Sequence, residues 1–340
     1  MSEVELLTPT RSPLRRLTGV QIVGTGSYVP EQVVTNEALA SLGCDAEWII
    51  QRTGIRERRH APPEISTSDM AVAAAERAIE AAGIDRNEID LIVLATLSPD
   101  YLLPATAAAV QDRLKLNCAA MDVSAACAGF MYALVTGMQF VATGSSKYAL
   151  VIGADTNSRV MNPEDKKTFP LFGDGAGAVL LTRGSNEQGL LTYTLGADGS
   201  GEQLLIRPFG GSRSPLNGQT SDAANLYVKM DGRPVFKWAV RLLEDSSRQV
   251  LEAANFKTSD VKLWLLHQAN IRILDAAADA LAIDRTKLET HIDRYGNTSA
   301  GSVPIALDEA LRAGRFSRGD LLLLCGFGGG LSWGTALVRW

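Results

Sequence analysis

The sequence feature that most constrains the fold is an internal repeat. Segments of the first half match segments of the second half at one fixed spacing of 172 positions, without a gap. Three residue pairs define this spacing: Leu91 with Leu263, Cys127 with Ser299, and Ala149 with Leu321. Any two α/β segments resemble each other to some degree, but three ungapped matches at one spacing favour an internal duplication.

Each half alternates apolar, β-rich runs with alanine-rich helical stretches. In the first half "IDLIVLATL" predicts a buried strand and "PATAAAVQDRLKL" the helix after it. In the second half "VKLWLLHQ" and "ANIRILDAAADALAI" repeat that order. The pattern is that of an α/β fold. We expect a loose N-terminal arm over residues 1–17, one half over 18–185 and the other over 186–340.

The composition excludes several classes of protein. The chain has 340 residues, of which 46% are hydrophobic, and a formal net charge of −5, so a large core is expected and broad nucleic-acid binding is not. It shows no apolar run of transmembrane length and no signal-peptide pattern. The four cysteines have no CxxC spacing, which favours a reducing compartment over disulfides or a zinc site. We therefore expect a cytoplasmic protein with no metal site and no membrane partner.

The segment "DVSAACAGF" contains the candidate nucleophile, Cys127. This cysteine lies between the end of a predicted strand and the start of a predicted helix. The unpaired N–H groups and the dipole at a helix start favour a negative charge. We therefore expect a thiolate to form more easily there than in free cysteine. The small neighbours of Cys127 leave room for a substrate carbonyl. The alternative is a small buried hydrophobic residue without function.

Two polar residues of the second half are candidate partners of the cysteine. His267 ends the strand of "VKLWLLHQ", and the duplication places it at the same edge of the sheets as Cys127. Asn297 lies in "YGNTSAG", the turn equivalent to the cysteine turn, and its amide has hydrogen atoms to donate. His60 is expected on a surface and His291 in a strand or loop. The run "CGFGGG" offers backbone that a substrate can approach closely.

The ordered set of Cys127, "HQAN", "GNTS" and a terminal "GFGGG…WGTALVRW" closely resembles the β-ketoacyl-acyl-carrier-protein synthase III family, the condensing enzymes that initiate bacterial fatty acid synthesis. The similarity runs from about residue 18 to residue 340 and includes "EWIIQRTGIRERR", "FGDGAGAV" and "VFKWAV". The resemblance implies the thiolase fold, two pseudo-repeated α/β halves in a five-layered αβαβα core. It also implies a homodimer and an acyltransferase of the EC 2.3.1 class.

The resemblance also implies roles for the candidate residues. Cys127 would attack the thioester of an acyl-CoA primer and become acylated. Malonyl-acyl carrier protein would then lose CO₂, with His267 and Asn297 donating hydrogen bonds to the thioester oxygen. The backbone N–H groups of Cys127 and Gly329 would form the oxyanion hole. Fixed donors suit both steps, because each places negative charge on oxygen. No cofactor is implied beyond the CoA thioester, which is a substrate.

Residues for substrate binding follow from the same resemblance. Coenzyme A would meet Trp48, Arg52, Gly232, Phe236 and Asn270. The acidic carrier protein would dock on Lys237, Arg241 and Arg272, of which the first two share a helix face. The sequence departs from the family pattern at Lys166-Lys167, where an Arg-Gly pair is usual. It also departs at Leu103, where a phenylalanine often caps the primer pocket.

Other functions remain open on the sequence. A related thiolase-fold acyltransferase of secondary metabolism, which joins an acyl group to a different acceptor, can use the same three residues. Elongating synthases pair the cysteine with two histidines, and Asn297 occupies the second place here. A non-catalytic thiolase-fold subunit typically lacks the nucleophile, which this chain retains.

Overall fold

The computed structural model describes residues 12–216 and 223–340. Ten strands of these residues form two five-stranded sheets, one from each half of the chain. The N-half sheet has the order β2 (Val20–Tyr28), β8 (Gly175–Arg183), β7 (Tyr148–Asp155), β5 (Ile89–Ala95) and β6 (Ala119–Val123). The C-half sheet has the order β1 (Arg15–Thr18), β9 (Gly189–Ala197), β14 (Ser332–Arg339), β13 (Leu321–Gly328) and β12 (Leu263–Leu266).

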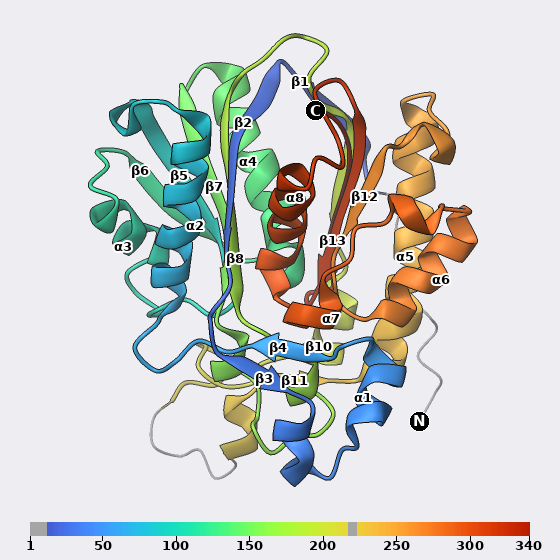
Figure 1. The fold of residues 1–340 in the computed structure, drawn as a ribbon. Helices are drawn as coiled ribbons and strands as arrows, with labels where there is room; N and C mark the ends of the chain where they lie inside the picture. Colours follow the sequence, from blue (N-terminus) through green and yellow to red (C-terminus); the bar gives the residue numbers. More distant parts are fainter. Residues whose placement is uncertain (1–11, 217–222) are drawn as a thin grey trace.

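Helices cover both faces of both sheets, so the molecule has five layers (Figure 1). The N-half sheet carries α2 (Thr67–Ala82) and α3 (Thr106–Arg113) on its outer face, and the C-half sheet carries α5 (Gly232–Ala253) and α6 (Ile271–Leu281) on its outer face. Between the sheets lie α4 (Gly129–Thr143) and α8 (Ser302–Arg312). The predicted αβαβα thiolase fold is therefore confirmed.

The strands read as continuous apolar runs because each has a helix layer on both sides. In β5, Leu91 and Val93 point to the core between the sheets, whereas Ile92 and Leu94 point to the core under α2. Strand β13 behaves in the same way between the central and the outer layer. Alternation of side chains along a strand thus gives apolar residues at every position when both faces are buried.

One helical stretch of the described residues, Ala126–Thr143, is long and apolar enough to cross a membrane. It contains α4, which lies between the two sheets, and most of it is buried inside the protein. A core helix with both sides against apolar sheets has this composition, so burial accounts for it.

The duplication is visible strand by strand, but its spacing shifts along the chain. Strands β2, β5, β7 and β8 correspond in order and direction to β9, β12, β13 and β14. Leu91 pairs with Ala149 across the N-half sheet, whereas Leu263 pairs with Leu322 across the C-half sheet. Leu322, not Leu321, is therefore the structural equivalent of Ala149. The spacing between the two halves is thus one residue longer at β13 than the sequence match indicates.

The same shift affects the turn that holds the cysteine. The two short 3₁₀ helices that precede α4 and α8 are η3 (Ala126–Ala128) and η10 (Ser299–Gly301). Both begin on a non-glycine residue with positive φ, 47° at Ala126 and 52° at Ser299. Ala126, not Cys127, is thus the structural equivalent of Ser299, because one extra residue enters the second half before this turn.

Each sheet also has one strand without an equivalent. Strand β6 lies beyond β5 at one edge of the N-half sheet, and in the C-half only an isolated bridge between Trp264 and Leu288 remains at that place. Strand β1 lies at the other edge of the C-half sheet, beside β9. This differs from the predicted loose arm over 1–17, since residues 15–18 form a paired strand; residues 1–11 lie outside the described residues. The expected boundary near residue 185 falls between β8 and β9.

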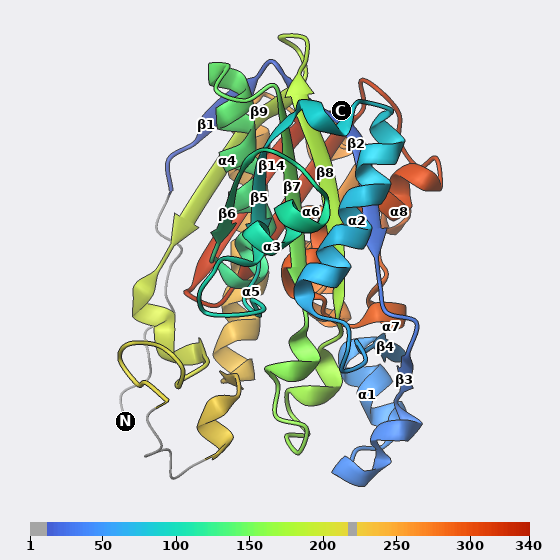
Figure 2. The ribbon, with the colours of Figure 1, turned by 90° about the vertical axis from the view of Figure 1, so that its left-hand side faces the viewer.

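The connecting elements gather at one end of the two sheets (Figures 1 and 2). They are α1 (Ala46–Thr53), the antiparallel pair β3 (Val33–Thr35) and β4 (Glu57–Arg59), the pair β10 (Leu205–Ile206) and β11 (Lys229–Met230), and α7 (Ile292–Tyr295). The residues that follow β12 and precede α8 lie at this end, so it is where the predicted site residues of both halves meet.

Candidate active site

Cys127 lies in η3, between the end of β6 and the start of α4. Its side chain is 6% exposed and reaches a small, mostly apolar pocket of about 130 Å³. The pocket is lined by Leu97, Ala126, Cys127, Met161, Phe172, Leu205, Ile206, Arg207, Val228 and Gly329. Residues of both halves therefore enclose the thiol, as the duplication predicts.

The thiol of Cys127 is protonated at neutral pH in the free protein. Burial raises its pKa to about 12; the Ser299 hydroxyl opposes this rise, and the negative charge of Asp155 adds to it. The expectation that a thiolate forms more easily here than in free cysteine is therefore wrong. The helix start does lie next to the thiol, but removal from water outweighs it, because burial penalises the charged form of a thiol.

The glycine run after β13 packs directly against the cysteine. A Cβ atom on Gly328 would lie 2.8 Å from the backbone nitrogen of Cys127 and 2.9 Å from its Cβ, so only glycine fits. Gly329 follows at the wall of the pocket. Among the backbone hydrogen bonds of the described residues outside helices and strands, none is donated by the N–H of Cys127 or of Gly329. Two amide donors are thus available beside the thiol.

His267 follows the last residue of β12 and is 1% exposed. Its backbone N–H donates to the carbonyl of Cys325, 2.8 Å away, and its ring packs edge-on against Phe327 with centroids 5.0 Å apart. Burial lowers the pKa of the imidazole to about 3, so the ring is neutral. Nδ1 is buried without a partner among the described residues, whereas Nε2 is not one of the buried atoms that lack a partner. A neutral ring with its proton on Nε2 can donate one hydrogen bond to a ligand.

Asn297 presents its amide nitrogen because its amide oxygen is already bound. Oδ1 accepts a hydrogen bond from the backbone N–H of Ser299 at 2.8 Å. The backbone is held on both sides by the loop after β7: Asn297 N–H donates to the carbonyl of Leu171 at 2.8 Å, and its own carbonyl accepts from Gly173 N–H at 3.0 Å. The hydrogen-bond network thus assigns Oδ1 to the protein and leaves Nδ2 as a donor.

The three predicted catalytic residues meet through shared neighbours. Phe327 packs on His267, and the next residue, Gly328, contacts Cys127. Phe172 forms a parallel bridge with Asn297 and also lines the pocket at Cys127. His267 and Asn297 are not themselves among the residues that line this pocket. The structure therefore places the three residues around the end of β13 and the loop at Phe172.

Three buried residues that the sequence did not assign to the site support this arrangement. The Asp155 carboxylate accepts from the backbone N–H of Ala300 at 3.0 Å and of Leu97 at 2.8 Å, which ties the end of β7 to the start of α8. Arg58 is fully buried, and its Nη2 donates to the carbonyl of Pro170 at 2.8 Å under the Phe172 loop. Burial lowers the pKa of Arg58 to about 10, so it remains charged. His291 is completely buried beside His267.

Sequence signals existed for only some of these residues. Asp155 ends the strand "YALVIGAD", and a polar residue at a strand end beside the cysteine turn is a recognisable signal. Arg58 belongs to a charged run that reads equally well as a solvated face. His60, expected on the surface, is half-buried against Phe169 with ring centroids 5.4 Å apart.

One predicted coenzyme A residue, Trp48, lines a second, mostly apolar pocket, and Arg52 packs beside its ring. Trp48 is 45% exposed on α1, and the guanidinium of Arg52 lies 5.5 Å from the centroid of its ring. A pocket of about 450 Å³ is lined by Gly43, Cys44, Asp45, Trp48, Lys166 and Lys167. The lysine pair that departs from the family pattern therefore faces Trp48 and offers positive charge at that place.

The other predicted binding residues lie along α5 and α6. Gly232 is the first residue of α5, and Phe236 follows one turn later, with the Arg272 guanidinium 6.0 Å from its ring centroid. Lys237, Arg241 and Arg272 are exposed. The Asn270 amide is used within the protein: Nδ2 donates to the Arg52 carbonyl at 3.1 Å and Oδ1 accepts from Arg272 N–H at 2.9 Å.

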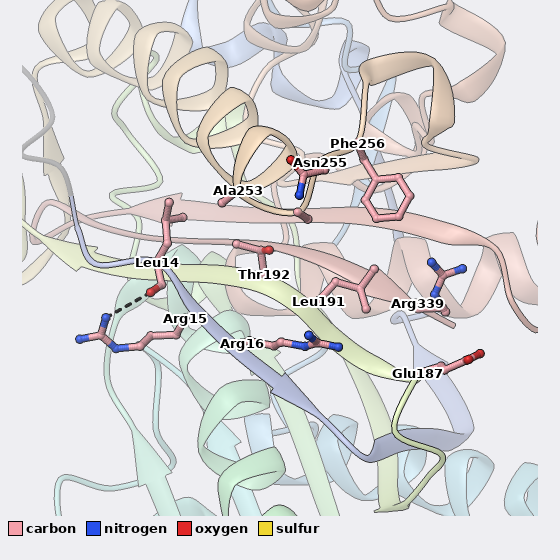
Figure 3. A pocket seen from close by; sticks show the side chains of 11 residues that line it. Leu14, Arg15, Arg16, Glu187, Leu191, Thr192, Ala253, Asn255, Phe256 and Arg339 are labelled. Carbon is pink, nitrogen blue, oxygen red and sulfur yellow. Dashed lines mark hydrogen bonds between the residues drawn. The ribbon is translucent and has the colours of Figure 1, made fainter.

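Leu103 does not reach the cysteine pocket of its own chain. It is 87% exposed, beside Leu102 at 83%, on the loop between β5 and α3. Another pocket, of about 700 Å³, lies between β1, β9 and the end of α5 and contains none of the predicted site residues (Figure 3).

Comparison with known proteins identifies the family. A family model described as 3-oxoacyl-[acyl-carrier-protein (ACP)] synthase III matches residues 121–199, and the model of its C-terminal part matches residues 251–340. The chain is 53% identical to the β-ketoacyl-[acyl-carrier-protein] synthase III of Rhodopirellula baltica, over 95% of this chain and 99% of that one. It is 47% identical to the synthase III of Desulfitobacterium hafniense, over 95% and 98%.

Solved structures give the same result for the fold. The structure of 3-oxoacyl-[acyl-carrier-protein] synthase III from Aquifex aeolicus superposes with a TM-score of 0.87 at 44% identity, over 95% of this chain and all of that one. These matches extend over both sheets and over the segments that carry Cys127, His267 and Asn297. The chain belongs to the 3-oxoacyl-[acyl-carrier-protein] synthase III family.

Proposed function

We propose that this chain is a β-ketoacyl-acyl-carrier-protein synthase III that condenses an acyl-CoA primer with malonyl-acyl carrier protein. The observation that carries the proposal is the pair of neutral, available donors, His267 Nε2 and Asn297 Nδ2, on segments that pack against the same elements as the enclosed thiol of Cys127. Such a pair stabilises an enolate oxygen and removes no proton from carbon, which is what a decarboxylative condensation needs.

In the first step the Sγ of Cys127 attacks the thioester carbon of the primer. The bond from Sγ to the acyl carbon forms, the bond from that carbon to the CoA sulfur breaks, and the thiol proton leaves with CoA as its free thiol. The backbone N–H groups of Cys127 and Gly329 donate to the oxyanion of the tetrahedral intermediate. Each such donor contributes roughly 3 kcal/mol to the transition state.

In the second step malonyl-acyl carrier protein loses CO₂, and the electron pair of the broken carbon–carbon bond moves onto the thioester as an enolate. His267 and Asn297 donate to its oxygen. The carbanion then attacks the acyl-cysteine, the new carbon–carbon bond forms, and the bond to Sγ breaks. The Cys127 thiolate takes up one proton from solvent, and the raised pKa of this thiol favours that uptake.

Substrate recognition is proposed on the two charged surfaces. Trp48 and Arg52, with Lys166 and Lys167 across the pocket, would hold the adenine and phosphates of CoA, because a flat aromatic ring and nearby cations suit a nucleotide. Gly232, Phe236 and Asn270 would line the path of the pantetheine arm. Lys237, Arg241 and Arg272 form an exposed cationic surface on α5 and α6 for the acidic carrier protein.

We also propose a homodimer formed through the open edge of the N-half sheet. Among the strands that the structure describes, β6 has a neighbour, β5, on one side only, and Ala119 is exposed. An unpaired edge strand is a template for pairing with a second copy. Leu103 fits this arrangement, since a residue that is 87% exposed in its own chain can close only the primer pocket of the partner.

The reaction proceeds by thioester exchange and decarboxylation, so the substrates supply every reacting group, and we propose an enzyme without a further cofactor. We also propose that the enzyme is cytoplasmic. The similarity to synthases III favours this reaction over acyl transfer to an amine or hydroxyl acceptor. The test is an assay for β-ketoacyl-carrier protein and CO₂ with acetyl-, branched- and longer-chain CoA primers. Product that needs both Cys127 and malonyl-carrier protein supports the proposal; acyl transfer to another acceptor, without malonyl-carrier protein, overturns it.

A further inference from the structure

A second buried histidine lies behind the candidate catalytic histidine. His291 is 0% exposed, and neither of its ring nitrogens has a partner among the described residues. Nδ1 of His267 is buried and unpartnered in the same way. Leaving a buried polar atom without a hydrogen bond costs about 1–3 kcal/mol, so three such atoms on two neighbouring rings need an explanation.

The side chain of Gln268 ties the segments of the two histidines together. The Oε1 atom of Gln268, the residue after His267, accepts a hydrogen bond from the backbone N–H of His291 at 3.2 Å. The amide nitrogen of the same glutamine donates to the carbonyls of Leu266 at 2.8 Å and of Glu289 at 3.1 Å. The rings are close enough that a charge on His291 would lower the pKa of His267. Neither ring nitrogen of His291 bonds directly to His267 in the structure.

The proton on His267 has to be on one particular nitrogen for the proposed chemistry. Nδ1 is buried in the interior and Nε2 is not, so the ring donates to a thioester oxygen only when Nε2 carries the proton and Nδ1 carries the lone pair. A neutral imidazole has one nitrogen of each kind, and the hydrogen bond made by one nitrogen selects the state of the other. A donor facing Nδ1 therefore sets the catalytic form of His267.

We propose that His291 is a positioning residue for His267: through one shared water, its ring N–H keeps Nδ1 of His267 unprotonated and the proton on Nε2. A buried water needs polar partners, and the two rings offer the unsatisfied atoms for it. The ring of His291 is itself fixed, packed against Tyr295 with centroids 5.4 Å apart. It also opens α7, the short helix that ends two residues before Asn297, so it contacts the segments of both proposed donors.

This inference rests on the proposed roles of His267 and Asn297, and its test separates the two. Nitrogen-15-labelled histidine in the full-length protein gives signals from three residues, and His267→Asn assigns the one that matters. Wild type is expected to show His267 in the Nε2–H form alone. His291→Leu and His291→Phe remove the donor and are expected to give a mixture of both tautomers. His291→Asn retains a donor and is expected to restore the single form.

The kinetic prediction is equally specific. Loss of the donor is expected to lower malonyl decarboxylation by about 10- to 100-fold while leaving acylation of Cys127 unchanged, because only the enolate step uses His267. Ile292→Val, a buried neighbour on the same segment without a polar atom, controls for repacking. A folded His291→Phe protein with His267 still entirely in the Nε2–H form overturns the inference. Failure of every acyl-CoA to acylate Cys127 would instead reject the proposed function, and the tautomer result would stand.

Discussion

The amide oxygen of Asn297 accepts a hydrogen bond from the backbone N–H of Ser299 at 2.8 Å, and this bond leaves the amide nitrogen available as a donor. Asn297→Asp tests the consequence. Aspartate keeps the acceptor for Ser299 but replaces the donor with a charged oxygen, so decarboxylation is expected to fall by about 10²- to 10³-fold, whereas acylation of Cys127 is expected to persist. Release of labelled CO₂ measures the first step and protein mass the second.

The matched control is Asn157→Asp. Asn157 is as deeply buried, and its Nδ2 donates to the carbonyl of Gly173 at 2.7 Å in the loop that holds Asn297. If Asn157→Asp lowers decarboxylation as far as Asn297→Asp does, the effect comes from the loop and the donor role of Asn297 is rejected.

Gly328→Ala is expected to displace the nucleophile. The added Cβ would lie 2.8 Å from the backbone nitrogen of Cys127, a distance that backbone atoms do not tolerate. A shift of about 1 Å at a reacting atom costs roughly 10²-fold, so the rate of acylation should fall by about that factor. At Gly329 the added Cβ would lie 3.1 Å from the carbonyl oxygen of Leu205, so Gly329→Ala is expected to lose less. Equal losses in the two variants, measured as the rate of mass gain with acyl-CoA, would contradict this account.

Alkylation reports the protonation state of Cys127. Because burial raises the pKa of this thiol to about 12, its reaction with iodoacetamide should accelerate about tenfold per pH unit from pH 6 to pH 9, without a plateau. Peptide mass spectrometry follows the residue, with free glutathione as the reference thiol. A plateau at neutral pH would show a thiolate in the resting protein and restore the sequence-based expectation.

The buried histidines make stability depend on pH. Burial lowers the pKa of His267 and of His291 to about 3, below the value near 6.5 that each has in the unfolded chain. Below pH 6.5 the unfolded chain therefore binds protons that the folded protein does not. Each histidine then lowers the free energy of unfolding by about 1.4 kcal/mol per pH unit, down to about pH 3.

Urea denaturation at several pH values checks this dependence with His267→Asn beside wild type. The variant should lose less stability between pH 6.5 and pH 5 than wild type does, by one histidine's share, and the two slopes should coincide above pH 7.5. Parallel slopes below pH 6.5 would mean that His267 already titrates in the folded protein.

The sequence predicts the layers of this fold better than its details. Two sheets with central helices follow from the repeat and from apolar runs such as "IDLIVLATL", because both depend on local pattern. The one-residue shift that makes Ala126 the equivalent of Ser299 does not follow, since an ungapped match contains no information on backbone φ. Only the folded turn shows it.

In the site, too, the sequence predicts the residues better than their surroundings. Cys127, His267 and Asn297 stand out in the sequence as polar residues at strand ends and turns, and the structure brings their segments together. The depth of burial is a property of the whole fold, and it decides the pKa of Cys127, the charge of Arg58 and the place of His291. For that reason the sequence misjudges the thiol and gives His291 no role in the site.

One measurement tests the central claim most directly: the intact mass of the purified protein after incubation with acetyl-, branched- and longer-chain acyl-CoA. We predict a gain of one acyl group per chain with the preferred primer. The gain should be absent in Cys127→Ala and present in Cys118→Ala, whose cysteine is half-buried elsewhere in the protein. In the wild-type protein the gain should be lost again when malonyl-carrier protein is added. No gain with any primer in the folded protein, or a gain that persists in Cys127→Ala, would contradict the account.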